Sequence, residues 1–122
     1  VVVGTVKGDI HDIGKDIVNF MLDVNGFQVT DLGVDVPIEK FVEKIKELQP
    51  PVVALSGFLT LAYTSMKETV DAIVTAGLRD EVKIMVGGGT IDQQVCDYVK
   101  ADAFGKDAMS AVVLAKQWTG GN

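Results

Sequence analysis

The chain has 122 residues, about the size of one domain, so we expect a single hydrophobic core. A hydrophobic fraction of 48% with only 7% aromatic residues indicates an aliphatic interior, which suits a buried parallel sheet. The net charge of −6 argues against nucleic acid as a partner, because phosphate backbones bind clustered Lys and Arg. Cys96 is the only cysteine and allows no internal disulfide. Without a secretory signal or an apolar run of roughly 20 residues, we expect a cytoplasmic protein and no membrane partner.

Short apolar runs alternate with longer amphipathic segments along the chain, which is the pattern of βα units that feed a parallel sheet. We expect strands at residues 1–6, 27–32, 52–56, 83–86 and 102–104. The first three helices should end at Asn25-Gly26, Pro50-Pro51 and Gly77, and two more should cover residues 93–100 and 107–118. Helical spacing predicts that the first and third helices carry apolar faces made of Ile17, Phe20, Met21 and Val24, and of Met66, Val70, Ile73 and Val74.

Five βα units with right-handed crossovers predict an α/β fold, a doubly wound, flavodoxin-like or Rossmann-like parallel sheet of order 2-1-3-4-5 with helices on both faces. In that order strand 2 lies on one side of strand 1 and strands 3 to 5 lie on the other, so the direction in which strands are added reverses between strands 1 and 3. Ligands of such sheets bind beyond the carboxyl ends of the strands at this switch point. The loops after strands 1, 3 and 4 should meet there, and they contain His11, Ser56 and the triplet Gly87-Gly88-Gly89.

The loop after the first strand, "GDIHDIGK" at residues 8–15, contains the only histidine of the chain between Asp9 and Asp12. Taken alone, His11 is most simply a loop residue that hydrogen-bonds locally. Zinc needs three or four protein ligands, which the chain does not offer. A metal bound by this protein must therefore bring most of its own ligands, as a macrocycle does, and need only one imidazole. Asp9 is well placed to accept the other ring N–H of such a histidine.

The glycine triplet by itself indicates a tight strand-to-helix turn, since it matches neither the dinucleotide nor the nucleoside-triphosphate loop pattern. It also provides a surface without side chains. A bulky planar group could lie against such a backbone.

Together, the three elements resemble the signature of cobalamin-binding domains, which is D-x-H-x-x-G, about 41 residues, S-x-L, about 27 residues, and G-G. The chain has 41 residues between Gly14 and Ser56 and 28 between Phe58 and Gly87. The match spans nearly the whole chain. Two positions depart from the pattern: Phe58 stands where the signature has leucine, and Ala62 stands where methionine synthase has a serine.

The resemblance implies a corrinoid bound base-off, with His11 as the lower axial ligand of cobalt and Asp9 hydrogen-bonded to His11. Ser56 would contact the displaced nucleotide tail, Gly87 and Gly88 would leave room for it, and Thr60 would place a hydroxyl nearby. The candidate site implied by the resemblance comprises Asp9, Ile10, His11, Asp12, Ile13, Gly14, Ser56, Phe58, Leu59, Thr60, Gly87, Gly88 and Gly89.

The phrases "GDIHDIGKDIV" and "VTDLGVDVP" look like the methyl-transferring branch of this family, found in methionine synthase and in small corrinoid proteins of methanol, methylamine and aryl methyl ether metabolism. The implied role is a methyl carrier, not catalytic alone, that cycles between methylcobalamin and cob(I)alamin. Its implied partners are a donor-side methyltransferase, an acceptor-side methyltransferase with an acceptor such as tetrahydrofolate, and a reductive activator.

Two alternatives remain open: the cobalamin module of methionine synthase or of a mutase, and a corrinoid-dependent sensor or regulator. Relatives in methyl transfer generally carry a helical cap before this domain. We therefore expect residues 1–122 to be the cofactor domain alone, without that cap.

Overall fold

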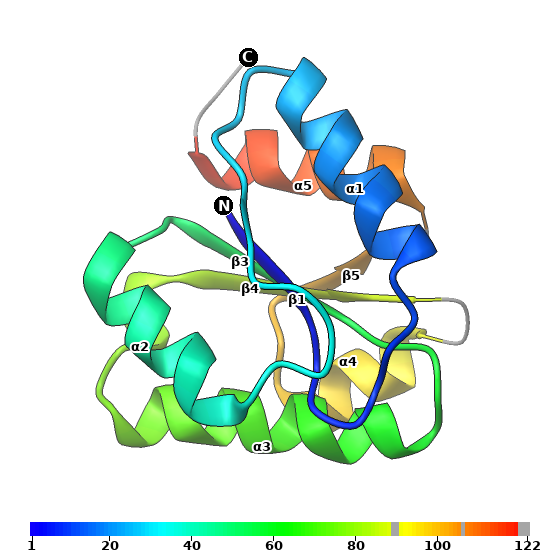
Figure 1. The fold of residues 1–122 in the computed structure, drawn as a ribbon. Helices are drawn as coiled ribbons and strands as arrows, with labels where there is room; N and C mark the ends of the chain where they lie inside the picture. The colour runs from blue at the N-terminus through cyan, green and yellow to red at the C-terminus, as the bar shows by residue number, and fades with distance from the viewer. Residues whose placement is uncertain (89–90, 106, 120–122) are drawn as a thin grey trace.

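The structure is a computed structural model that describes residues 1–88, 91–105 and 107–119. Within these residues, parallel strands form one sheet of order β2-β1-β3-β4-β5, which confirms the predicted topology (Figure 1). The strands are β1 (Val2–Thr5), β2 (Thr30–Asp31), β3 (Val52–Ser56), β4 (Lys83–Gly87) and β5 (Ala103–Gly105). The helices are α1 (Ile13–Val24), α2 (Ile38–Leu48), α3 (Leu61–Thr75), α4 (Gln93–Val99), α5 (Ala108–Thr119) and the 3-10 helix η1 (Arg79–Glu81). No helix in these ranges combines the length and apolarity that a membrane span requires.

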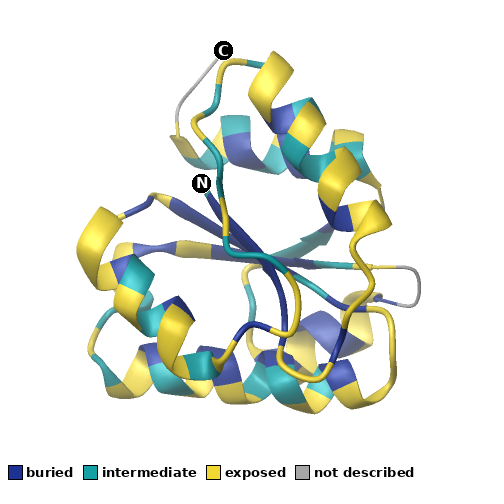
Figure 2. Cartoon of the chain, viewed as in Figure 1, coloured by how far each residue is buried: buried dark blue, intermediate teal, exposed yellow. Residues whose placement is uncertain are grey.

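The helices cover the sheet in two unequal layers (Figure 1): α2, α3 and α4 lie on one face, and α1 and α5 lie on the other. Successive strand residues point to opposite faces, so Val53 and Leu55 pack under α2, α3 and α4, whereas Ala54 faces α1 and α5. The first face has a large, tightly buried core that includes Phe41 and Ile84. Figure 2 shows the buried residues concentrated on the sheet and on the inner sides of the helices.

The structure differs from the expectations in the extent of β2 and in the exposure of apolar residues on α1 and α3. β2 covers Thr30–Asp31 rather than residues 27–32, because this edge strand pairs only with β1, through Val2 with Thr30 and Val3 with Asp31. On α1, the apolar residues that recur at helical spacing do not all pack against the sheet: Ile17, Phe20 and Val24 are each more than half exposed. α1 has apolar residues on more than one side, so periodicity alone does not identify the side that meets the sheet. Val74 of α3, which was predicted to point inward, is 53% exposed.

The parallel register aligns the ends of the central strands. Thr5 of β1 pairs with Ser56 of β3, and Ser56 pairs with Gly87 of β4. Beyond the strands, the Val6 N–H donates to the Ser56 carbonyl and the Gly57 N–H donates to the Gly87 carbonyl. The loops after β1, β3 and β4 therefore start side by side at one edge of the sheet, as predicted from the strand order.

Gly88 allows the loops after β3 and β4 to approach each other closely. Its φ is +146°, a conformation that residues with side chains rarely adopt. A Cβ atom built on Gly88 would overlap the carbonyl oxygen of Gly57. The second glycine of the motif is therefore required by backbone contact between two loops.

We predict that Gly88→Ala lowers the free energy of unfolding by about 1–3 kcal/mol, because both the φ angle and the Gly57 contact are incompatible with a side chain. Gly14→Ala is the matched control: Gly14 lies in the first turn of α1 with no atom near its built Cβ, so the change should be neutral or stabilise by up to about 1 kcal/mol. Urea unfolding of the ligand-free protein measures both. Equal stability of the wild type and Gly88→Ala would contradict the close contact.

Candidate functional site

The carboxylate of Asp9 joins the loop after β1 to the loop after β3. Its Oδ1 atom accepts hydrogen bonds from the backbone N–H of His11 at 2.9 Å and from the ring Nδ1 of His11 at 2.7 Å. Its Oδ2 atom accepts from the backbone N–H groups of Phe58 at 2.7 Å and Leu59 at 3.0 Å. Asp9 is fully buried, and both carboxylate oxygens are thus occupied by donors.

These donors determine the protonation state of Asp9 and the tautomer of His11. Burial by itself raises the pKa of Asp9, but the backbone N–H groups of Leu59, Phe58 and His11, together with the His11 ring, lower that pKa to about 2. Asp9 is therefore ionised at neutral pH and can only accept hydrogen bonds. The Nδ1 atom of His11 must carry the proton in this contact, which leaves the Nε2 lone pair free to bind a metal.

The His11 ring is held on one side and accessible on the other. Its side chain is 47% exposed, and its ring lies 4.7 Å from that of Phe58 with an angle of 30° between the planes. Phe58, which replaces the leucine of the sequence signature, thus packs directly against the candidate ligand. Among the residues that the structure describes, no group of three or more His, Cys, Asp or Glu could hold a metal ion. His11 would accordingly serve as a single protein ligand.

Asp35, in the loop before α2, supports the His11 loop from a third side. Its carboxylate Oδ1 accepts the Gly8 N–H at 2.7 Å, and its own N–H donates to the Asp9 carbonyl at 2.8 Å. Asp35 has a φ of +49°, a left-handed conformation that is uncommon outside glycine, asparagine and aspartate. The backbone of Asp9 is therefore braced by a residue in an unusual conformation.

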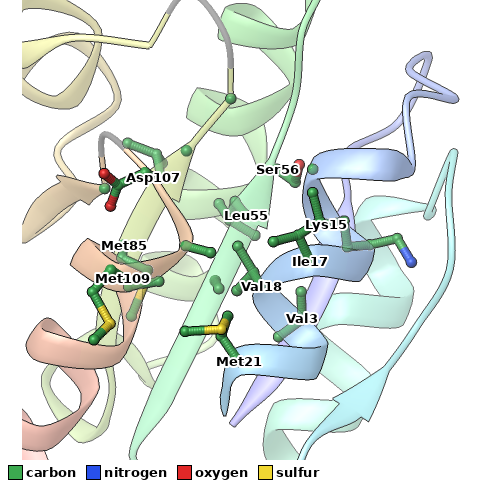
Figure 3. A pocket seen from close by; sticks show the side chains of 18 residues that line it. Val3, Lys15, Ile17, Val18, Met21, Leu55, Ser56, Met85, Asp107 and Met109 are labelled. Carbon is green, nitrogen blue, oxygen red and sulfur yellow. The ribbon is translucent and has the colours of Figure 1, made fainter. Parts of the chain in front are cut away.

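A pocket of about 530 Å³ opens next to this loop on the α1 and α5 face of the sheet (Figure 3). Its volume falls within the roughly 300–1,000 Å³ typical of small-molecule sites. α1 and α5 form its walls, and β3 and β4 line the side that faces the sheet. Gly14, Ser56, Gly87 and Gly88 all contribute to its lining, so parts of all three sequence motifs surround one cavity.

Lys15 holds the α1 wall in place. Its side chain is only 3% exposed, and its Nζ atom contacts Asp31 at 2.8 Å and Asp16 at 3.0 Å. Burial lowers the pKa of this ammonium, but the hydrogen bonds and charges of Asp31 and Asp16 outweigh burial and raise the pKa above its ordinary value. Since Asp31 belongs to β2, the pair ties the first turn of α1 to the edge of the sheet. In Figure 3 the ammonium points away from the pocket.

The predicted site residues fall into four groups. Gly14, Ser56, Gly87 and Gly88 line the pocket. Asp9, His11, Phe58 and Leu59 form the hydrogen-bonded loop pair described above. Ile10, Asp12, Ile13 and Thr60 are exposed and do not line the pocket, and the Asp12 side chain makes no capping hydrogen bond to α1. Gly89 lies outside the described residues.

Several pocket and loop residues were not predicted from the sequence. Lys15 and Asp35 resemble ordinary polar surface residues in the sequence, although Lys15 lies within "GDIHDIGK" and Asp35 lies within "VTDLGVDVP". The α5 wall, with Asp107 and Met109, follows β5. Its contribution could have been inferred, because the loop after the fifth strand opens at the same sheet edge.

We predict that Asp9→Asn lowers the free energy of unfolding by roughly 2 kcal/mol at neutral pH, because one end of the amide must present N–H groups to N–H donors. The depressed pKa means that wild-type stabilisation by Asp9 is complete above about pH 4 and is lost as the pH falls toward about 2. Urea unfolding between pH 2 and pH 7 should show a larger loss in the wild type than in the variant, in which the Asp31 carboxylate, whose pKa is also lowered, still titrates.

Asp12→Asn is the control, since Asp12 is exposed and makes no helix-capping bond; it should change the free energy of unfolding by less than about 0.5 kcal/mol. An Asp9→Asn protein as stable as Asp12→Asn at neutral pH would contradict the role assigned to the carboxylate.

Comparison with known proteins places this geometry in a family. Residues 1–113 match the B12 binding domain. The trimethylamine corrinoid protein of Methanosarcina barkeri is 49% identical over 116 residues, which is 95% of this chain and 54% of that protein. A crystal structure of a cobalamin-binding protein from Desulfitobacterium hafniense DCB-2 superimposes with a TM-score of 0.94 at 48% identity, covering 96% of this chain and 57% of the other. A crystal structure of the methanol:cobalamin methyltransferase complex of Methanosarcina barkeri superimposes with a TM-score of 0.92 at 30% identity, covering 99% of this chain and 46% of the other.

The chain spans about half the length of the trimethylamine corrinoid proteins that it matches. The residues present here fit a corrinoid on their own chemistry: one imidazole with a free Nε2, and beside it a large cavity bordered by glycine backbone. Matched over residues 1–113 and folded in the predicted strand order, the chain belongs to the B12-binding domain family, and its cofactor is a corrinoid.

Proposed function

We propose that this domain binds its corrinoid base-off, with the Nε2 atom of His11 as the lower axial ligand of cobalt, and serves as a methyl carrier between methyltransferase partners. The observation that carries the proposal is the buried Asp9 carboxylate bonded to Nδ1 of the only histidine in the chain. That contact directs the free lone pair away from the carboxylate. A bound corrinoid supplies the cobalt that accepts and releases the methyl group.

The residues around the pocket have separate tasks in this proposal. Ser56, at the end of β3, would offer a hydroxyl to the nucleotide tail in the cavity between α1 and α5, and Gly87 and Gly88 would keep space for that tail free of side chains. Asp9 keeps the His11 ring in one tautomer and one orientation. Phe58 packs against the ring and limits its rotation. These residues would thus orient the imidazole and leave space for the cofactor.

The methyl-carrier role is supported by the kinds of protein that the chain resembles. The names of its relatives include trimethylamine and dimethylamine corrinoid proteins, and one structural relative is a methanol:cobalamin methyltransferase complex. We propose a methylamine as the first donor class to test. A donor-side methyltransferase, an acceptor-side methyltransferase and a reductive activator are the partners proposed.

The axial ligand can be tested by isotope labelling, because His11 is the only histidine in the sequence. We predict that the cobalt(II) form of the loaded protein shows nitrogen splitting of its electron paramagnetic resonance signal. The splitting should change from a triplet to a doublet when the protein carries ¹⁵N-histidine. A triplet that persists after labelling would mean that the cofactor's own base is the ligand.

His11→Ala should lose the splitting and regain a triplet on addition of free imidazole. Asp12→Ala, a change in the same loop, should keep the wild-type signal.

The carrier role is tested with the reduced, loaded protein. Incubated with methyltransferases and monomethylamine, dimethylamine, trimethylamine or methanol, it should be methylated with one enzyme and its matching donor, seen as a change in the visible spectrum. His11→Ala should still bind corrinoid but be methylated more slowly. Failure with every pair, by a protein that binds the corrinoid normally, would favour a sensor over a carrier.

A further inference from the structure

The pocket on the α1 and α5 face is polar at one end and apolar at the other. Ser56 and Asp107 lie at the end nearest the strand termini (Figure 3), and Gly88 directly follows β4. The opposite end is lined by the side chains of Val3, Val18, Met21, Ala54, Met85 and Ala111. This second group, which we call the pocket floor, contains no polar side chain.

The charged groups of the residues that line the pocket are bound to partners outside the pocket floor. The Lys15 ammonium is engaged by Asp31 and Asp16, so only the alkyl part of that side chain faces the cavity. The Oδ1 atom of Asp107 accepts the Ser110 N–H at 2.8 Å in the first turn of α5. Both charged side chains therefore already have partners.

The main chain at the floor is also occupied. Ala54 sits in the middle of β3, paired with Val3 of β1 on one side and with Met85 of β4 on the other. Met85 is in turn paired with Ala103 of β5. Since these peptide groups hydrogen-bond within the sheet, a ligand at the floor meets methyl and thioether groups but no hydrogen-bond partner from the strands.

We propose that the pocket floor selects corrinoids by their nucleotide base, favouring an apolar alkylated benzimidazole over a purine. This rests on the proposed function, since it places the displaced tail in the cavity. A purine would bring ring nitrogens and an exocyclic amine into a region that leaves them unpaired, and each unpaired polar group weakens binding by roughly tenfold or more. A dimethylated ring would instead bury its methyl groups and contact the sulfur atoms of Met21 and Met85.

The test is a comparison of affinities for corrinoids that differ only in the tail. The ligand-free protein is titrated with cobalamin, which carries dimethylbenzimidazole, with its adenine analogue, and with cobinamide, which has no nucleotide. Quenching of Trp118, the only tryptophan, reports binding independently of any methyl transfer. We expect cobalamin to bind most tightly and the adenine analogue about tenfold or more weaker. Equal or tighter binding of the adenine analogue, or of cobinamide, overturns the proposal.

Two methionine variants locate the effect. Met21→Gln puts an amide of similar length at the floor and should narrow the preference for cobalamin over the adenine analogue. Met109→Gln is the matched control: Met109 also lines the cavity but is 55% exposed, so its replacement should leave the preference unchanged. The same shift in both variants would overturn the assignment to the floor. If Met21→Gln does not fold, the wild-type ranking still decides.

Two measurements separate base selection from the proposed function: the ranking of corrinoid affinities and the ¹⁵N-histidine splitting. Cobalamin and the adenine analogue binding equally, with the ¹⁵N-histidine splitting intact, would refute base selection alone. No binding of any corrinoid would refute both.

Discussion

The buried carboxylate of Asp9 is the interaction on which the rest of the candidate site depends. An ionised group without partners in this position would be costly, and here each oxygen is satisfied by N–H donors. Two of those donors belong to His11 and two belong to the loop after β3. The same carboxylate therefore orients the imidazole and holds the loops after β1 and β3 together. A change that disturbs either loop should also disturb the candidate ligand, even where it does not touch the ring.

The two faces of the sheet differ in packing: one carries the larger core, and the other borders the cavity. Under α2, α3 and α4, large aliphatic side chains and Phe41 form the larger of the two cores, and most of the stabilising burial lies there. Under α1 and α5 the strands present Ala54 and Met85, and the glycines at the sheet edge leave room for a cavity. A cavity weakens the ligand-free fold, and a ligand that fills it stabilises the fold by mass action. The Lys15 and Asp31 pair holds α1 over this space where side-chain packing is sparse.

The sequence predicted the arrangement of the fold better than the orientation of its helices. Strand order and the meeting of the three motif loops followed from βα alternation, because parallel strands end at the same sheet edge. The side on which α1 is buried did not follow, since apolar residues occur around much of that helix and Ile17, Phe20 and Val24 proved exposed. Lys15 and Asp35 were missed for a related reason: only their partners, Asp31 and the Asp9 loop, distinguish them from surface residues.

The sequence by itself determined the topology and the local pair of Asp9 and His11, because residues two positions apart in a tight loop meet with little help from the rest of the chain. Tertiary structure alone decided what occupies the second oxygen of Asp9, which accepts N–H groups of Phe58 and Leu59, 49 and 50 residues away. It also decided that the motif glycines border a cavity with an apolar floor. Both depend on strand register and helix packing, whose distances are set by contacts between segments remote in sequence.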